Sequence, residues 1–128
     1  PSKDHPGVLY ADELLDKLRL RRARLVVLAA CSSAGGYPVG PQGLSGLVRP
    51  LFAAGAPAVL GSLWNVPDTV TEELLVDFHR HFRAGEDAAS SLRLAQLDLL
   101  EQKNPALRSV VAWAPFEVVG HASSPFRP

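Results

Sequence analysis

The stretch that decides the fold is Arg24-Leu-Val-Val-Leu-Ala-Ala-Cys-Ser-Ser-Ala-Gly-Gly36. Its apolar run, Leu25–Ala30, contains two adjacent β-branched valines, is too short for an ordinary helix and ends abruptly in small polar residues. Such a run is typical of a strand that is covered on both faces, as in a parallel sheet. We therefore expect an α/β fold built around this strand.

The only cysteine, Cys31, directly follows the run, with Ser32, Ser33 and two glycines behind it. Ligand and catalytic sites of open α/β sheets collect at the carboxyl ends of the strands, so a thiol there is well placed for chemistry. A free cysteine is also commonly a small buried hydrophobic residue. From position alone, both interpretations of Cys31 are open.

Composition limits the class of protein. The 128 residues suffice for one domain or part of one, and 13 basic residues balance 13 acidic ones, which gives no bulk attraction to nucleic acid or to an anionic membrane. No apolar run approaches the ~20 residues of a membrane helix, and no signal-peptide pattern opens the chain. A single cysteine suits a reducing compartment, so we expect a cytoplasmic protein.

The sequence gives no pattern for a cofactor or a metal. The glycine-rich segment between Cys31 and Gln42 lacks the GxxxxGK[ST] pattern of a phosphate-binding loop and the GxGxxG of a dinucleotide fold. CxxC and Cys/His ligand spacings are missing from the sequence as well. We therefore expect neither cofactor nor metal.

Helical and strand patterns alternate along the chain. The expected helices are Ala11–Leu20, Gly43–Ala54 with Pro50 inside, a segment beginning at the capping box Thr69-Val-Thr-Glu72, and Ala88–Gln102 behind the N-cap Asp87; the expected strands are Leu25–Ala30, Ala58–Trp64 and part of Trp113–Gly120. This order is typical of a mostly parallel sheet with helices on both faces. Three strands are few for such a sheet, so we expect further strands before Pro1.

Four segments, in this order, carry a resemblance to a known family. They are Leu25-Val-Val-Leu-Ala-Ala-Cys-Ser-Ser-Ala-Gly35, Gly46-Leu-Val48 with Ala53-Ala-Gly-Ala56, Leu60-Gly-Ser-Leu-Trp-Asn-Val-Pro-Asp68, and Trp113-Ala-Pro-Phe-Glu-Val-Val-Gly120. From about Val8 to Gly120 the chain resembles the CHAT domain, the caspase-like domain of the caspase–gingipain–separase clan that often accompanies tetratricopeptide repeats.

The resemblance implies a caspase-like three-layer fold, of which residues 1–120 would be the C-terminal, cysteine-bearing portion and residues 121–128 a flexible tail. It also implies a cysteine endopeptidase with a His–Cys dyad in which Cys31 is the nucleophile and its backbone N–H contributes to the oxyanion hole. A free thiol, with an ordinary pKa of about 8.5, needs a nearby base to become a thiolate. The implied partners are a peptide substrate, the missing N-terminal part of the domain and a tetratricopeptide-repeat region.

The resemblance implies substrate-binding roles for Asp68, Asn65, Trp64 and Ser32 as well. Asp68 matches a position that lines the S1 pocket, where a carboxylate would favour a basic P1 side chain through charge-assisted hydrogen bonds. Asp68 is equally well placed to be the N-cap of the following helix, and one residue can serve both purposes. Trp64 fits a pocket wall or the core better than it fits a catalytic group.

The histidine of the dyad has no assignable position in this sequence. The family carries it in a His-Gly motif after the preceding strand, whereas His5 is followed by Pro6 and lies only 26 residues before Cys31. His79 and His81 lie two apart on a helix and face different directions. Either the histidine comes from outside this chain, or the domain is a non-catalytic docking module. A serine hydrolase is not indicated, because no Gly-x-Ser-x-Gly elbow is present.

Overall fold

The computed structural model describes residues 13–14, 17–29 and 45–121. Within this part of the chain the elements follow the predicted order, with two single-turn helices added before the last strand. The strands are β1 (Val26–Val27), β2 (Ala58–Ser62) and β3 (Phe116–Gly120), and the helices are α2 (Ser45–Ala53), α3 (Asp68–Arg83), α4 (Ala88–Glu101), α5 (Pro105–Arg108) and α6 (Val110–Trp113).

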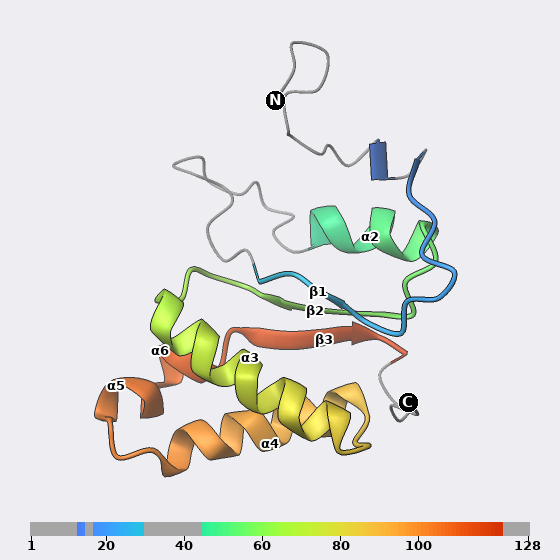
Figure 1. Ribbon diagram of the computed structural model, residues 1–128. Coiled ribbons are helices and arrows are strands. Elements are labelled where there is room, and N and C mark those ends of the chain that lie inside the picture. The colour runs from blue at the N-terminus through green and yellow to red at the C-terminus, as the bar shows by residue number, and fades with distance from the viewer. Residues whose placement is uncertain (1–12, 15–16, 30–44, 122–128) are drawn as a thin grey trace, which may run out of the picture.

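The three described strands form one mixed sheet in the order β1-β2-β3. β1 is parallel to β2, with Val26 opposite Val59, whereas β3 is antiparallel to β2, with Ser62 opposite Phe116. The alternation of elements did not predict the direction of β3. The cause is the helix pair: α3 runs away from the carboxyl end of β2 and α4 runs back, so the chain starts β3 at the edge where β2 ends (Figure 1).

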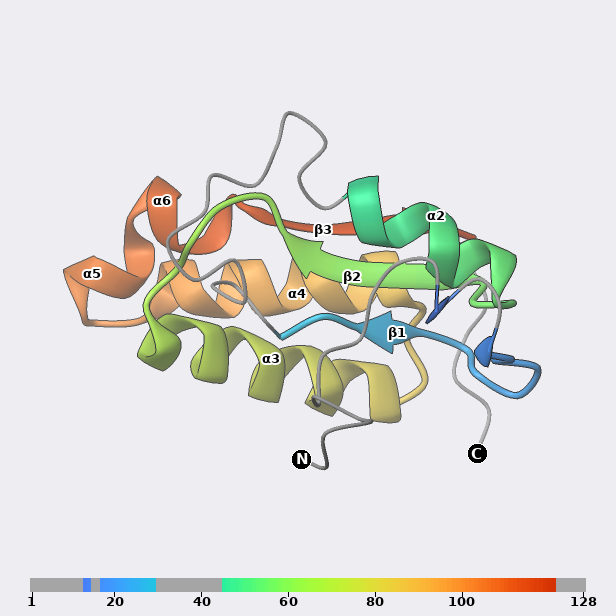
Figure 2. The same cartoon turned by 90° about the horizontal axis from the view of Figure 1, so that it is seen from above.

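Helices cover both faces of the sheet, with α2 on one side and the pair α3–α4 on the other (Figures 1 and 2). Neighbouring strand residues divide between the two layers. Val59 packs in the cluster that contains Val48 and Leu51 of α2, whereas Leu60 packs in the cluster that contains the buried residues of α3 and α4. Because side chains alternate along a strand, a sheet covered on both faces needs a continuous apolar run. The predicted three-layer α/β architecture is thereby confirmed.

The spacing of Leu74 and Phe78 in α3, and of Leu92, Ala95 and Leu99 in α4, predicts one inward face for each helix. This prediction is correct, because all five residues belong to the larger core cluster. Its fully buried members from these helices are Leu74, Phe78, Ala95 and Leu99, each at 0% exposure. On the opposite layer, the sequence spacing places Leu47 on one helical face with Val48 and Leu51, but this expectation is wrong at Leu47, which is 39% exposed. Val48 and Leu51 fill the contact of α2 with the sheet, and Leu47, in the first turn, lies outside it.

The end of α2 is fixed by a glycine, Gly55, as its place just beyond the expected helix suggests. Gly55 has a φ of +103°, its N–H donates to the Phe52 carbonyl at 2.9 Å, and the N–H of Ala56 donates to the Leu51 carbonyl at 3.0 Å. This pair of bonds is the Schellman arrangement, which needs a left-handed residue and therefore favours glycine. Pro50 lies inside α2, as predicted.

The start of α3 differs from the prediction. Asp68 is the first helical residue, Pro67 occupies the N-cap position, and no side chain makes a capping hydrogen bond, so the Thr69–Glu72 capping box is not formed. Pro67, with a φ of −55°, is already in the range that helix entry requires, and its carbonyl accepts the N–H groups of Val70 and Thr71 at 3.0 and 3.1 Å. Asp87, by contrast, is the N-cap of α4, as predicted, and accepts the N–H of Ser90 at 2.9 Å.

The expected first helix, Ala11–Leu20, is described only in part. Glu13, Leu14 and Lys17 are helical, Lys17 pairs with Glu13 at 2.7 Å, and Leu14 is buried in the cluster on the α2 side of the sheet. Residues 11–12 and 15–16 of that helix, the glycine-rich segment after Cys31 and residues 122–128 of the predicted tail lie outside the described residues. In the part of the chain that the structure describes, no helix combines the length and the apolar character that crossing a bilayer would need.

Candidate functional site

The carboxyl ends of β1 and β2 share one edge of the sheet, because the two strands are parallel. The ladder continues past β1 through Leu28, whose N–H donates to the Leu60 carbonyl at 2.9 Å, and the described segment ends at the exposed Ala29. Cys31 and Ser32 follow in the sequence and lie outside the described residues. The structure therefore gives the position of the strand that leads to the predicted nucleophile, and that strand ends at the expected edge.

The other three predicted site residues lie on one short connection at the same edge. Trp64, Asn65 and Asp68 are all exposed, on the loop between β2 and α3 and at the first position of α3. Between them, Val66 is buried in the core cluster under α3 and α4. The loop therefore presents Asn65 and Asp68 to solvent while it is anchored by Val66.

Trp64 lies at the surface rather than in the core, with 44% of the residue exposed. Its indole Nε1 donates to the carbonyl of Val111 on α6 at 3.1 Å, a contact that spans 47 residues of sequence. Two further bonds hold the same loop: the N–H of Leu63 donates to the Pro115 carbonyl at 2.9 Å, and the Ser62 hydroxyl donates to the carbonyl of Trp64 itself. The loop after β2 is thus attached to the segment that leads from α6 into β3.

That segment is in turn attached to α4 by Gln96, whose Nε2 donates to the carbonyls of Trp113 at 3.1 Å and Phe116 at 3.3 Å. Sequence reasoning missed both α6 and Gln96. The available signal was a glutamine one turn from Leu92 and Leu99, at the border of the apolar face of α4. No local sequence pattern predicts that the partners of Gln96 are two backbone carbonyls at and near the start of β3.

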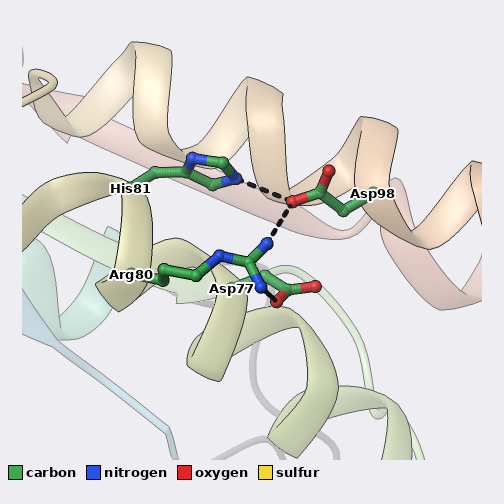
Figure 3. Close-up of polar contacts among 4 residues, drawn as sticks. All are labelled: Asp77, Arg80, His81 and Asp98. Atoms are coloured by element: carbon green, nitrogen blue, oxygen red, sulfur yellow. Dashed lines mark hydrogen bonds and ion pairs between the residues drawn. The ribbon is translucent and has the colours of Figure 1, made fainter. Parts of the chain in front are cut away.

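The three described histidines lie away from this edge. His79 is exposed and His81 is half-buried, both in the last turns of α3, where the Nε2 of His81 meets the Oδ2 of Asp98 at 2.7 Å (Figure 3). His121 follows β3, and its N–H donates to the carbonyl of Pro57, which precedes β2, at 2.8 Å. His79 and His81 thus face different directions, as predicted, and His5 lies outside the described residues.

Two hollows border α3, and neither includes the predicted site residues. One, of about 690 Å³, is lined by Glu72, Leu75, Val76, His79, Arg80 and Arg83, and the other, of about 400 Å³, by Glu73, Asp77, Arg80, Asp98, Glu101 and Gln102. Among the described residues, no three His, Cys, Asp or Glu side chains gather closely enough to hold a metal ion. Both hollows thus lie apart from the described residues Trp64, Asn65 and Asp68.

The model of one protein family, described as the CHAT domain, matches residues 1–121. The chain belongs to the CHAT domain family. This CHAT domain is also 36% identical, over 113 residues, to "Tetratricopeptide repeat protein 28" of Mus musculus. The alignment covers 88% of this chain and 4% of the mouse protein, so the chain spans a small part of that relative. No solved structure matches. The mixed sheet with helices on both faces is compatible with the caspase-like fold that the resemblance implied.

Proposed function

We propose that this CHAT domain is the nucleophile-bearing part of a cysteine endopeptidase. One observation carries the proposal: Trp64, Asn65 and Asp68 meet at the carboxyl edge of a parallel strand pair, and β1 of that pair leads in the sequence to Cys31. The family match supports it. The histidine of the dyad and the further strands of the domain would be supplied from outside this chain.

In the proposed reaction a histidine takes the proton of the Cys31 thiol, and the thiolate sulfur forms a bond to the scissile carbonyl carbon. Backbone N–H groups, that of Cys31 included, stabilise the oxyanion that develops on the carbonyl oxygen. The C–N bond then breaks, the leaving amine takes the proton from the histidine, and water hydrolyses the thioester to release the acid and the free thiol.

Asp68 would select a basic P1 side chain. Its carboxylate is exposed at the first position of α3 and, within the part of the chain that the structure describes, makes no side-chain capping hydrogen bond, so its oxygens are accessible to a substrate. A carboxylate–guanidinium pair provides both charge and two parallel hydrogen bonds. Substrates would be proteins or peptides, a tetratricopeptide-repeat region would accompany the domain, and the reducing cytoplasm would keep the thiol active.

The first test labels the full-length protein with a thiol-reactive peptide probe that carries a basic P1 residue, followed by intact-mass analysis. We expect one adduct, on Cys31, and neither adduct nor proteolysis in Cys31→Ala at unchanged thermal stability. If Cys31→Ala still cleaved substrate, the assignment of Cys31 as the nucleophile would be refuted. If neither a basic-P1 probe nor an apolar-P1 probe formed an adduct, with the protein folded and its activator present, the proposed peptidase activity would be refuted.

The second test concerns P1 selectivity. In Asp68→Asn we expect the ratio of kcat/KM for an arginine substrate over its glutamine analogue to fall about 10- to 100-fold, because a charge-assisted hydrogen bond contributes about 1.5–3 kcal/mol. Glu72→Gln, an exposed carboxylate one turn further along α3, is the matched control and should leave the ratio unchanged. An unchanged ratio in Asp68→Asn would reject this residue as the P1 determinant.

A second candidate is a non-catalytic docking module. The observation that favours it is the placement of His79, His81 and His121, which all lie away from the carboxyl edge of β1 and β2. Such a module would be folded and unreactive toward both classes of probe, with the activator present, and would still bind its partner after Cys31→Ala.

A further inference from the structure

The loop between β2 and α3 is held at several points along a very short length. At its start, the N–H of Leu63 donates to the Pro115 carbonyl at 2.9 Å and the indole of Trp64 donates to the Val111 carbonyl at 3.1 Å. Further along, Val66 is 6% exposed in the core. Pro67 then fixes the backbone just before Asp68. Asn65 and Asp68 are therefore exposed side chains on a constrained backbone.

The acceptors of these hydrogen bonds belong to a segment that is itself well anchored. Ala112 of α6 is 2% exposed, and Gln96 of α4 donates to the carbonyls of Trp113 and Phe116 on either side of Pro115. α4 thus supports α6, and α6 supports the loop. Figure 1 shows how this comes about: α6 lies beside the edge where β2 ends and α3 begins.

We propose that the hydrogen bond from Trp64 Nε1 to Val111 O is a clamp that positions the substrate-binding loop, and that P1 selectivity at Asp68 depends on it. Trp64 is then a positioning residue, whose N–H is engaged with α6 rather than with substrate. The proposal rests on the proposed peptidase function. It assigns to α6 a part in specificity that the resemblance did not imply.

Geometry links the clamp to selectivity. Three residues separate Trp64 from Asp68, and one of them is a proline, so a shift of the Trp64 backbone is transmitted along the loop. A bidentate contact between a carboxylate and a guanidinium tolerates little misplacement, whereas a neutral P1 side chain makes no such contact. Loss of the clamp should therefore weaken binding of basic substrates more than binding of neutral ones.

The test uses Trp64→Phe in the full-length protein, which keeps an aromatic ring and removes the N–H donor. We expect KM for the arginine substrate to rise, kcat to change little, and the arginine-to-glutamine selectivity ratio to fall about fivefold, the value of one ordinary hydrogen bond. Trp113→Phe is the matched control, because the Nε1 of Trp113 is buried and has no hydrogen-bond partner among the described residues. A purely structural effect of Trp64→Phe would lower kcat/KM equally for the arginine substrate and its glutamine analogue, and would contradict a role in selectivity.

A second measurement does not depend on catalysis. Amide hydrogen exchange of residues 63–66 should be faster in Trp64→Phe than in the unmodified protein, and unchanged in Trp113→Phe. Equal exchange in all three proteins would overturn the clamp. Faster exchange together with an unchanged selectivity ratio would overturn its part in specificity.

The two proposals can fail separately. If the unmodified protein cleaves nothing and Cys31 resists labelling, the peptidase is refuted, while faster exchange in Trp64→Phe would still establish the clamp. Gln96→Met gives an independent variant, since it removes the two hydrogen bonds that anchor the acceptor segment. It should loosen the same loop amides, and unchanged exchange there would contradict the support of α6 by α4.

Discussion

His81 and Asp98 join α3 to α4 through a side-chain contact of 2.7 Å between Nε2 and Oδ2. The same carboxylate oxygen accepts a hydrogen bond from Arg80 at 2.9 Å, and Arg80 also pairs with Asp77 at 3.0 Å (Figure 3). The Asp98 carboxylate thus contacts two side chains of α3, those of Arg80 and His81. The network lies at the border of the core cluster, over the packed faces of the two long helices.

Removal of this acceptor should cost little stability. Arg80 and Asp98 have side-chain exposures of 62% and 31%, so solvent screens their attraction. We expect Asp98→Ala to lower the free energy of unfolding by about 1 kcal/mol in urea titrations, with a smaller difference in high salt. Glu101→Ala, an exposed carboxylate nearby on α4, is the control and should have a smaller effect. A loss larger than about 3 kcal/mol, independent of salt, would show that the network behaves as a buried one.

Gly120 should be among the least replaceable residues of the fold. A Cβ built there would lie 2.5 Å from the Pro57 carbonyl oxygen and 2.9 Å from the Phe52 ring, and the φ is +108°. We expect Gly120→Ala to lower the free energy of unfolding by about 2–5 kcal/mol. The added methyl group would clash with the Pro57 backbone, and alanine would have to adopt a left-handed conformation.

Gly85 provides the matched control for Gly120. Its φ is +109°, and no atom of the described part of the chain lies within 4 Å of its added Cβ. Gly85→Ala should therefore cost only the conformational part, about 1 kcal/mol, in the same urea titration. Equal losses for the two variants would mean that the contact with Pro57 relaxes freely.

The two aspartates at helix starts should respond differently to removal. Asp87 caps α4 through bonds to the backbone N–H of Ser90 at 2.9 Å and to its hydroxyl at 3.1 Å. Asp87→Ala should lower the unfolding free energy by about 1 kcal/mol. Asp68→Ala should leave it within about 0.5 kcal/mol, because Asp68 makes no cap bond. A larger loss of unfolding free energy in Asp68→Ala, measured in thermal or urea unfolding, would indicate that Asp68 does cap α3.

The core between α3 and α4 should be sensitive to truncation. Leu99 is 0% exposed in the larger core cluster, and Leu99→Ala should cost about 2–5 kcal/mol. Val76 is 61% exposed on the outer side of α3, and Val76→Ala should cost well under 1 kcal/mol. Similar losses for the two variants would indicate that the outer side of α3 is covered in solution.

Much of the fold follows from local patterns. The runs around Val27 and Leu60, and the spacing of Leu74 and Phe78, predict buried elements because burial repeats with the period of a strand or a helix. The direction of β3 is different in kind, because it depends on how the α3–α4 pair returns the chain to the sheet. The start of α3 was missed because Pro67 provides the helix entry that a capping box would otherwise supply.

For the candidate site, the place of the described residues in the fold was predictable from local patterns, whereas their contacts were not. Trp64, Asn65 and Asp68 follow a buried strand, and the parallel pairing of β1 and β2 brings that position to the edge where β1 ends. The partner of Trp64 was not predictable, because Val111 contributes only a backbone carbonyl, 47 residues away. Every residue carries the same backbone carbonyl acceptor, so the sequence alone does not distinguish Val111 from other residues as the partner of Trp64.

The late position of β3 in the chain has a consequence for biosynthesis. β2 pairs with β3 from Ser62–Phe116 to Ala58–Gly120, so one whole edge of the central strand stays open until both long helices have left the ribosome. The helices α3 and α4 are neighbours in sequence and can associate early, whereas strand pairing over such a separation is slow. A nascent or prematurely terminated chain that ends before Phe116 would expose β2 as a template for pairing with other chains. The pairing of β3, late in synthesis, is thus the step that covers this edge of β2.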